Sequence, residues 1–454
     1  MRKKIVAQRA IFDQSIDQLT KLISPERILK RMDTIINERD QIVALLHKQM
    51  TGGVSNTGSY GMSAEQIFRL AVLRQLKQYS WREFAERLND GIALRWFTRF
   101  YSAKIPHFTT LQKAVRSIAP DTWSAINDML VDLAEERKLE KGRKLRADTT
   151  VVQTNIAYPT DAQLLWGSVR VLTRIMERIR EQLPMFDFGF ANRTRCSKKL
   201  CYQITLLKGP NAEKKRRKLY RRLIKVVNQV FDMACACYHQ APDCNDLHVM
   251  ALLEQLDHFL TLAAVAIDQC ERRILKGETV PSSEKIVSLF EEHTDIIRRG
   301  KSSSPTEFGH KVNFVTGKSG LITQYQVLRG NPGDNELFAD MLKKHTKQYG
   351  RVPDELSADR RYFSADNESS AYQAGVKRVS ICKPGYRSKE RRQLEKERWF
   401  RRLQRFRAGI EGIISALMRG LGLKRCLWQG WQAFKRYVGL SVVTFNLRKI
   451  AMLQ

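Results

Sequence analysis

The feature that most constrains the fold is a long stretch, residues 160 to 300, that has helical periodicity and almost no strand signal. Segments such as LLWGSVRVLTRIMERIREQL repeat apolar residues at three- and four-residue spacing, as helices with one buried face do. Runs that favour β-strands lie before and after this stretch. We therefore interpret residues 158–304 as a helical insertion in a domain that contains a sheet.

The strand signals around the insertion predict a mixed α/β domain. KGRKLRADTTVVQTNI contains a short β-branched run bounded by charge, which indicates a buried strand. KVNFVTGKSGLITQYQVLRGNPGDN reads as a hairpin whose strands meet at residues 317–320. A helix, a short strand, a helix, a strand and a basic helix over 388–420 follow in that order. Such an alternation predicts a mixed sheet covered by helices on both sides.

The N-terminal third is predicted to be helical throughout. Residues 1–50 have a helical apolar rhythm and end in the linker-like segment TGGVSNTGSYG. Ser63, followed by Glu65 and Gln66, is a candidate N-cap for the next helix. Residues 60–140 then suggest several short helices joined by tight turns, which is typical of helix-turn-helix modules and equally of a plain helical bundle with a basic face.

Charge points to a polyanionic partner. The chain has 79 Lys and Arg against 47 Asp and Glu, a formal net charge of +32, and nucleic acid is the simplest partner for such an excess. AEKKRRKLYRRLIKVV, with seven basic residues at 214–222, and RSKERRQLEKERWFRRLQRFR, with interleaved aromatic residues, could each follow a phosphate backbone. A solvated helix face, or core packing of the aromatic side chains, explains the same patterns.

The remaining composition favours a cytoplasmic protein with reduced thiols. No run of about 18 uninterrupted apolar residues occurs, and no signal-peptide pattern is visible at the N-terminus, so we expect no membrane partner. The eight Cys are scattered along a long chain, which favours free thiols over disulfides. One cluster has zinc-ligand residue types without the usual paired spacing: Cys235, Cys237, His239, Cys244 and His248.

Three acidic residues lie in surroundings that are otherwise apolar. Asp148 falls within the first predicted strand, where an unpaired carboxylate is costly to bury and calls for a metal ion or a cationic partner. Asp359 ends the short apolar approach in LSADRRYF, with Asp354 and Asp366 as competitors for the same role. Glu411 lies on the apolar helix RAGIEGIISALMRGLG. Carboxylates at strand ends and on a facing helix suit two-metal phosphoryl transfer, although an ion pair with Lys or Arg would also explain Asp148.

A resemblance makes this interpretation more specific. KLRADTTVV, FGHKVNFVTGKSGLITQYQVLRGNPGDNE, DELSADRRYFS and FRAGIEGIISALMRGLGLKRCLW, in this order, resemble the catalytic domain of DDE-type insertion-sequence transposases. SAEQIFRLAVLRQLKQYSWREFAERLNDGIALRWF and IPHFTTLQK resemble the helical DNA-binding region of the same broad family. The resemblance covers residues 60 to 150 and 305 to 450.

The resemblance implies a ribonuclease-H-like catalytic domain split into residues 141–157 and 305–450, with 60–140 as the DNA-binding region. It places the family's metal-binding Asp-Asp-Glu triad on Asp148, Asp359 and Glu411, and the Arg that precedes the family's Glu on Arg407. It implies two Mg²⁺ or Mn²⁺ ions as cofactors. The partners it implies are the terminal inverted repeats, target DNA and a second copy of the chain.

The chain departs from the family pattern at two positions. A Tyr three positions before the Arg and a Lys seven after the Glu are common in the family, and here they are Gln404 and Met418. The departure bears on hairpin-type DNA handling and on some terminal phosphate contacts, for which Arg419 or Lys424 could substitute. Two other functions stay open at this point, a non-catalytic DNA-binding protein derived from a transposase and a metal-dependent DNA endonuclease without strand transfer.

Overall fold

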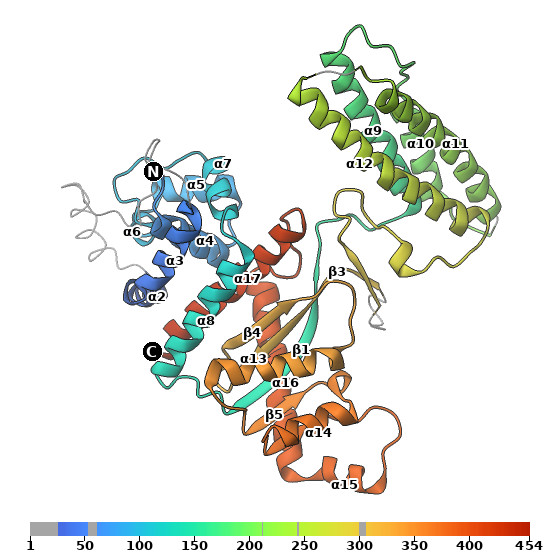
Figure 1. The fold of residues 1–454 in the computed structure, drawn as a ribbon. Coiled ribbons are helices and arrows are strands. Elements are labelled where there is room, and N and C mark those ends of the chain that lie inside the picture. The colour runs from blue at the N-terminus through green and yellow to red at the C-terminus, as the bar shows by residue number, and fades with distance from the viewer. Residues whose placement is uncertain (1–25, 53–60, 211, 243–244, 299–305) are drawn as a thin grey trace. The chain divides into compact units, whose positions relative to one another are not determined.

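The structure, a computed structural model, describes residues 26–52, 61–210, 212–242, 245–298 and 306–454 (Figure 1). The chain divides into two compact units, one made of Met1–Thr154 with Gly309–Gln454 and the other of Asn155–Phe308. The first unit contains most of a six-stranded mixed sheet together with helices, so it is an α/β unit. The second is mainly helical.

Short helices make up the N-terminal part of the first unit. Ser63 begins the helix Ala64–Lys77 as expected, with a capping box in which its hydroxyl accepts from the Gln66 N–H at 3.1 Å and its own N–H donates to the Gln66 side chain at 2.9 Å. Most apolar residues of this helix are fully buried because it packs among its neighbours. The helices of this part are α2 (Arg27–Glu38), α3 (Asp40–Thr51), α4 (Ala64–Lys77), α5 (Trp81–Asp90), α6 (Ile92–Thr98), α7 (Phe108–Arg116) and α8 (Pro120–Glu136).

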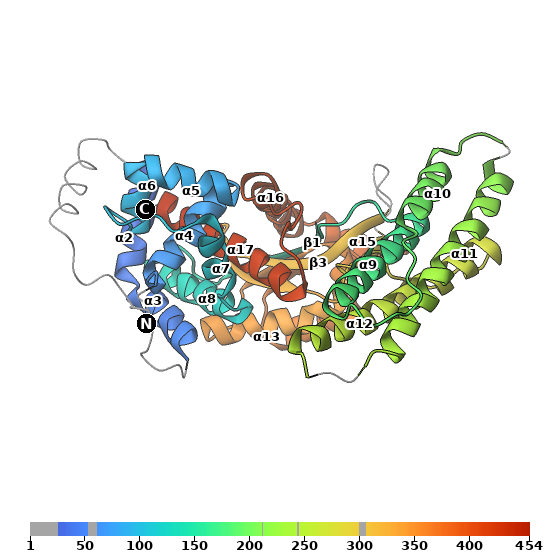
Figure 2. The same cartoon turned by 90° about the horizontal axis from the view of Figure 1, so that it is seen from above.

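The last helix, α17 (Trp431–Leu453), joins the N-terminal helices to the sheet. It is buried on nearly every side, including the consecutive residues Tyr437 to Thr444, and a helix that is apolar all round is a central helix. It packs against α2, α4, α8 and strand β4 (Ile322–Val327), and Figures 1 and 2 both show it beside α8. The N-terminal helices and the sheet therefore share one apolar core.

The sheet has the strand order β2-β3-β1-β5-β6, with β4 also paired to β3. β1 (Lys144–Gln153) is antiparallel to β3 (Thr306–Thr316), which forms the predicted hairpin with β4. On its other side, β1 is parallel to β5 (Glu355–Ala358), and β5 is parallel to β6 (Arg378–Ser380). β1 is thus a central strand with an antiparallel and a parallel neighbour.

Helices cover both faces of this sheet. Leu145 and Ala147 of β1 point to one face, where they share a core with Phe338 and Met341 of α13 (Phe338–Tyr349) and with α14 (Ala365–Gln373). Because side chains alternate along a strand, Arg146 and Asp148 point to the opposite face. That face is covered by α16 (Arg398–Gly420), which contacts β1, β5 and β6.

The second unit is a bundle of four helices with its own apolar core. These helices are α9 (Asp161–Gln182), α10 (Thr194–Leu206), α11 (Ala212–His239) and α12 (Leu247–Cys270). One stretch that includes α12, Leu247–Leu275, is long and apolar enough to cross a membrane by length and composition. A core helix of a soluble bundle passes the same test, and α12 contributes Leu252, Leu256 and Leu260 to the apolar core of the unit.

Two details differ from the expectations. The stretch interpreted as purely helical ends in a short strand, β2 (Asp295–Arg298), which four residues with two isoleucines signal too weakly to detect. The basic helix expected over 388–420 is two helices, α15 (Lys389–Lys396) and α16, because Glu397 has an extended backbone with φ −60° and ψ 146°. Charge composition is continuous across that break, so the pattern does not reveal it.

Asn446 offers a test of how the sheet is joined to α17. Its side chain accepts from the Ile322 N–H at 2.9 Å and donates to the Ile322 carbonyl at 2.7 Å and to Asn127 at 2.8 Å, all away from solvent. We expect Asn446→Ala to lower the free energy of unfolding by about 2–3 kcal/mol, because it leaves buried polar groups without partners. Urea unfolding followed by tryptophan fluorescence measures this change, since six of the seven Trp belong to the first unit.

Gln432→Ala is the matched control for that measurement. Gln432 is exposed on the same helix, and we expect its substitution to change the unfolding free energy by less than about 0.5 kcal/mol. A similarly small effect of Asn446→Ala would contradict the proposed role of this hydrogen-bond network.

Candidate active site

Two aspartates lie next to each other where the parallel strands β1 and β5 end. Ala147 and Ala358 are the last register partners of β1 and β5, and Asp148 and Asp359 are the residues that directly follow them along the chain. Asp359 leaves β5 with an extended backbone, φ −64° and ψ 155°. Neighbouring strands lie about 4.8 Å apart and in-register side chains point to the same face. The two carboxylates therefore approach one another on the face that α16 covers.

Polar side chains of the strands hold α16 on that face. Arg146 donates to the carbonyl of Phe406 at 2.5 Å, and Ser357 donates to the carbonyl of Leu403 at 3.0 Å. Arg146 also lies over the Phe406 ring at 4.5 Å, and its Nη1 would come within 2.4 Å of a Cβ atom at Gly409. A glycine at this position allows the close approach of the helix to β1. Composition and periodicity did not identify Arg146 or Ser357 as residues that hold α16. The available sign for Arg146 was its position next to the Asp in the predicted strand KLRADTT.

Arg407 lies between two of the three predicted carboxylates. Its Nη1 is 3.6 Å from Oδ2 of Asp148 and its Nη2 is 3.3 Å from Oε1 of Glu411, one helical turn further along α16. The other Asp148 oxygen accepts the N–H of Thr149 at 2.8 Å. The side chains of Asp148 and Arg407 are 19% and 18% exposed, whereas Glu411 is 67% exposed. Glu411 is thus the most accessible of the three acids.

The backbone after Asp359 is held by a buried hydrogen bond. The short helix η4 (Arg360–Tyr362) follows Asp359, and the Tyr362 N–H donates to the Asp359 carbonyl at 3.0 Å. The Tyr362 hydroxyl donates to Asn313 of β3 at 2.8 Å, and both side chains are buried. The sequence analysis did not identify Tyr362 and Asn313 as positioning residues. A polar Asn inside the apolar strand KVNFV was the sign that could have revealed Asn313.

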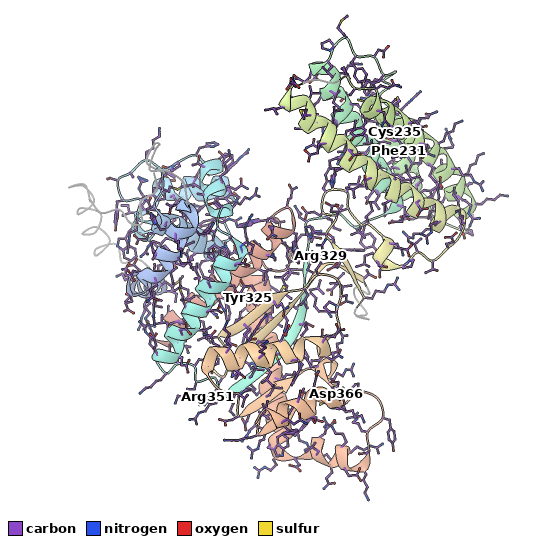
Figure 3. All side chains as sticks on the ribbon, in the orientation of Figure 1. Phe231, Cys235, Tyr325, Arg329, Arg351 and Asp366 are labelled. Atoms are coloured by element: carbon purple, nitrogen blue, oxygen red, sulfur yellow. The ribbon has the colours of Figure 1, made fainter. Side chains whose placement is uncertain are left out.

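The two competitors for the role of Asp359 lie elsewhere. Asp354 precedes β5 and pairs with Lys377 at 2.9 Å, and this hydrogen bond lowers the pKa of Asp354. Asp366 lies in the first turn of α14 (Figure 3). Neither aspartate occupies the register position beside Asp148.

The donor atoms of the site suit a hard divalent cation. Carboxylate oxygens are the ligands that Mg²⁺ and Mn²⁺ prefer. Within the described residues, no three His, Cys, Asp or Glu side chains come close enough together to form a ready metal site. The Arg407 guanidinium lies between Asp148 and Glu411 in this structure.

Comparison with known families agrees with this geometry. Residues 17–117 match the family described as "Transposase domain (DUF772)", and residues 291–447 match the "Transposase DDE domain". Together the two matches cover more than half of the chain. The chain belongs to the DDE-type transposases. No curated protein and no solved structure matches it.

Membership of this family makes the protein an enzyme of metal-dependent DNA cleavage and transfer, and the DDE domain implies a ribonuclease-H-like fold for the sheet region. Asp359, Arg407 and Glu411 lie within the DDE match. Asp148 lies outside both matches, so it is the strand register that places it beside Asp359.

The two positions where this transposase departs from the family pattern have structural roles. Gln404 donates to the carbonyl of Ser380 at 2.8 Å and so attaches α16 to β6. Met418 packs against the apolar core. Of the proposed substitutes, Arg419 donates to Ser415 on its own helix, and Lys424 is exposed in the segment after α16.

Further candidate motifs are the two basic stretches and the segment GKSG. Phe400 is 1% exposed and Phe406 lies under Arg146, so these aromatic residues of the basic stretch pack in the protein. In α11, Lys214, Lys218 and Arg221 are exposed. The segment GKSG forms a hairpin turn, as predicted, with Gly320 at φ 80° and the Ser319 hydroxyl donating to Glu140 at 2.6 Å.

The Cys and His cluster does not assemble into a metal site within the described residues. Cys235 and Cys237 lie on α11, where Figure 3 labels Cys235 (Figure 3), while His239 ends the helix and is exposed. Burial raises the pKa of Cys237 to about 12, which keeps this thiol neutral. Cys244 lies outside the described residues.

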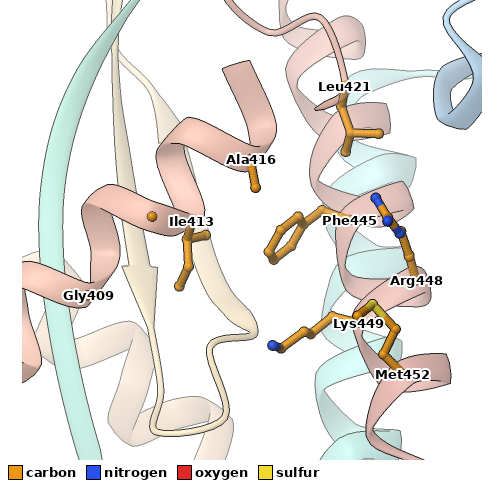
Figure 4. Close-up of a pocket in the computed structure, with 9 residues that line it drawn as sticks. Gly409, Ile413, Ala416, Leu421, Phe445, Arg448, Lys449 and Met452 are labelled. Atoms are coloured by element: carbon orange, nitrogen blue, oxygen red, sulfur yellow. The ribbon is translucent and has the colours of Figure 1, made fainter. Parts of the chain in front are cut away.

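A pocket of about 350 Å³ lies between α16 and α17 (Figure 4). Neither Arg407 nor Glu411 lines it, so it is separate from the candidate active site. Its wall combines small and apolar residues of α16 with two basic residues of α17: Gly409, Gly412, Ile413, Ala416, Leu421, Phe445, Arg448, Lys449 and Met452.

Gly409 tests whether the contact of α16 with β1 sets the geometry of the site. We expect Gly409→Val to push Arg146 away from the Phe406 carbonyl and to shift α16, because its Cβ would lie 2.4 Å from Arg146 Nη1. A displacement of about 1 Å at a catalytic group costs about 10²-fold in rate, so DNA cleavage should fall by about that factor. Gly412→Val is the matched control, because nothing lies within 4 Å of its Cβ position. Equal activity of the two variants would show that this contact does not matter.

Proposed function

We propose that this transposase binds the terminal inverted repeats of an insertion sequence, cleaves DNA strands by metal-dependent hydrolysis and joins the 3′-OH ends to target DNA. The observation that supports the proposal is the parallel register of β1 with β5, whose last pair, Ala147 and Ala358, directly precedes Asp148 and Asp359. α16 contributes Glu411 and Arg407 to the same face of the sheet.

Asp148, Asp359 and Glu411 would hold the divalent cations, Mg²⁺ or Mn²⁺, for which two ions are expected. Such ions would activate an attacking hydroxyl and stabilise the leaving oxygen. The three carboxylates supply the negative charge that such ions need. The part-burial of Asp148 limits its contact with water, which strengthens its attraction for a cation.

Arg407 changes partners in this proposal. In the free protein its guanidinium lies between Asp148 and Glu411 and offsets their charge. If cations were bound by the carboxylates, the Arg407 guanidinium would be available to orient a DNA phosphate through two parallel hydrogen bonds. Cation binding and phosphate binding would therefore support one another at this site.

The remaining roles follow from charge and from the family. The N-terminal helices from α4 to α7 are proposed to contact the terminal repeats, consistent with a net charge of +32. The helical insertion, residues 158–304 in our interpretation, is proposed to hold synapsed DNA or a second protomer. A homodimer is expected because two element ends must be paired, and the protein would work in the cytoplasm in association with the nucleoid.

Substitution of each triad residue tests the catalytic proposal. We expect Asp148→Asn, Asp359→Asn and Glu411→Gln each to abolish Mg²⁺- or Mn²⁺-dependent nicking at the repeat boundary, because each removes a charged ligand while keeping the side-chain shape. Affinity for labelled repeat DNA should stay within about threefold, since the carboxylates contribute no attraction for phosphate. A gel assay of nicking beside a binding titration measures both.

Asp366→Asn is the matched control, because Asp366 lies in α14 and not at the strand ends. It should cleave like the wild type. A folded, DNA-binding wild type that never cleaves would favour the non-catalytic alternative. Cleavage without joining when target DNA is supplied would favour an endonuclease.

A further inference from the structure

Three arginines from three different helices gather away from the candidate active site. Arg74 is on α4, Arg116 ends α7 and Arg436 is on α17, and α4 packs against both of the other helices. All three side chains are half-buried. Arg116 is the central member, since its charge acts on both Arg74 and Arg436. We refer to Arg74, Arg116 and Arg436 as the arginine cluster.

The arginine cluster has no acceptor within the part of the chain that the structure describes. The Nε atoms of all three residues are buried without a hydrogen-bond partner, and none of the guanidinium groups forms an ion pair there. Buried guanidinium donors are normally satisfied, and an unpartnered one is costly.

Two other buried arginines, Arg69 and Arg99 of the N-terminal helical part, show how buried guanidinium groups are usually satisfied. Arg69, also on α4, donates to Asp33 at 2.6 Å and to Glu65 at 2.8 Å, and Arg99 donates to the same Asp33 at 2.6 Å. The carboxylates of Asp33 and Glu65 thus neutralise the charges of the two arginines. The arginine cluster assembles three cations with no carboxylate, so its charge is not explained by the folding of this unit.

Burial and the charge of Arg116 both disfavour the charged forms of Arg74 and Arg436. Burial lowers the pKa of Arg74, the Tyr437 side chain raises it, and the positive charge of Arg116 lowers it. Burial and the charge of Arg116 also lower the pKa of Arg436. Each lowering of a pKa means that the surroundings disfavour the charged form, which an arginine nevertheless keeps at neutral pH. An anion placed among the three groups would reverse this.

Two of the guanidinium groups, those of Arg74 and Arg116, stack on tryptophan rings. Arg74 lies over the Trp81 ring at 4.8 Å, and Arg116 lies over the Trp428 ring at 5.9 Å. Trp428 is 3% exposed and its Nε1 is a further buried donor without a partner. Stacked guanidinium planes keep their N–H edges available for a ligand, as in sites that bind phosphate with two parallel hydrogen bonds.

We propose that the arginine cluster is a binding site for a phosphodiester group of the DNA backbone. A phosphate offers the oxygens that three guanidinium groups and their Nε donors lack. The neighbouring surface carries further positive charge, with Arg82 beside Trp81 and Lys113 one turn before Arg116, both exposed. A surface of this kind fits a continuous polyanion. The inference rests on the proposed contact of the N-terminal helices with DNA and identifies the residues that would hold a backbone phosphate there, apart from the triad.

Arg116→Gln in the full chain tests the site by DNA binding. Fluorescence anisotropy with a labelled duplex should show affinity lower by about tenfold or more, because one charge-assisted contact is lost. The slope of log affinity against log salt should become shallower by about 0.9 per phosphate contact removed, equally for repeat and unrelated duplexes. Lys377→Gln, which removes one charge from an ion pair with Asp354, should leave both quantities unchanged.

Thermal unfolding separates this role from a structural one. We expect Arg116→Gln to melt at the same temperature as the wild type or higher, because it relieves repulsion. Inorganic phosphate should raise the melting temperature of the wild type more than chloride at equal ionic strength, and this difference should vanish in Arg116→Gln.

Two results would overturn the proposal. A lower melting temperature with unchanged DNA affinity would make Arg116 a structural residue. Stabilisation by phosphate with an unchanged salt slope would make the ligand a free anion instead of DNA. Both readouts need no cleavage, so they stay informative even if the proposed catalytic triad fails its own test.

Discussion

The parallel pairing of β1 with β5 is the constraint on which the rest of the first unit depends. Parallel neighbours need a long crossover, and here the chain between them contains the whole second unit, the β3–β4 hairpin and α13. The pairing fixes which residues face α16 and which face α13, because a slip of one residue would exchange the two faces. The adjacency of Asp148 and Asp359 is a direct result of this register.

Buried polar side chains supply the specificity that apolar packing alone lacks. Arg146 and Ser357 fix α16 over the strands, Tyr362 fixes the loop after Asp359, and Asn446 joins α17 to the hairpin. Each makes defined hydrogen bonds away from water, and a shifted arrangement would leave buried donors unsatisfied. The candidate active site is therefore set by hydrogen bonds that fix α16 and the loop after Asp359 relative to the strands.

The sequence allowed the prediction of much of this fold because its periodicities are strong. The buried strand at Asp148, the hairpin, the long helical stretch and the Ser63 cap follow from alternation, turn residues and capping chemistry, and the structure contains them. The strand β2 and the break at Glu397 were missed because a few residues carry too little pattern. The arginine cluster could not be foreseen, since Arg436 lies more than 300 residues after Arg74 and Arg116 in the chain and meets them only through tertiary packing. The catalytic roles of Asp148, Asp359, Glu411 and Arg407 stay predictions.

The placement of the second unit between β1 and β3 has a consequence for synthesis on the ribosome. Gln153 is paired with Gly309, so β1 is complete long before either of its partner strands exists. At about 5–20 residues per second, β1 waits roughly 10–30 s for β3, and longer for β5. During that time Asn155–Phe308 can bury its own apolar core, while β1 emerges as an apolar strand with both edges open. Each nascent chain thus passes through an interval in which the future catalytic unit is exposed to aggregation and to chaperones, and its cleavage chemistry can begin only after synthesis of the C-terminal helices.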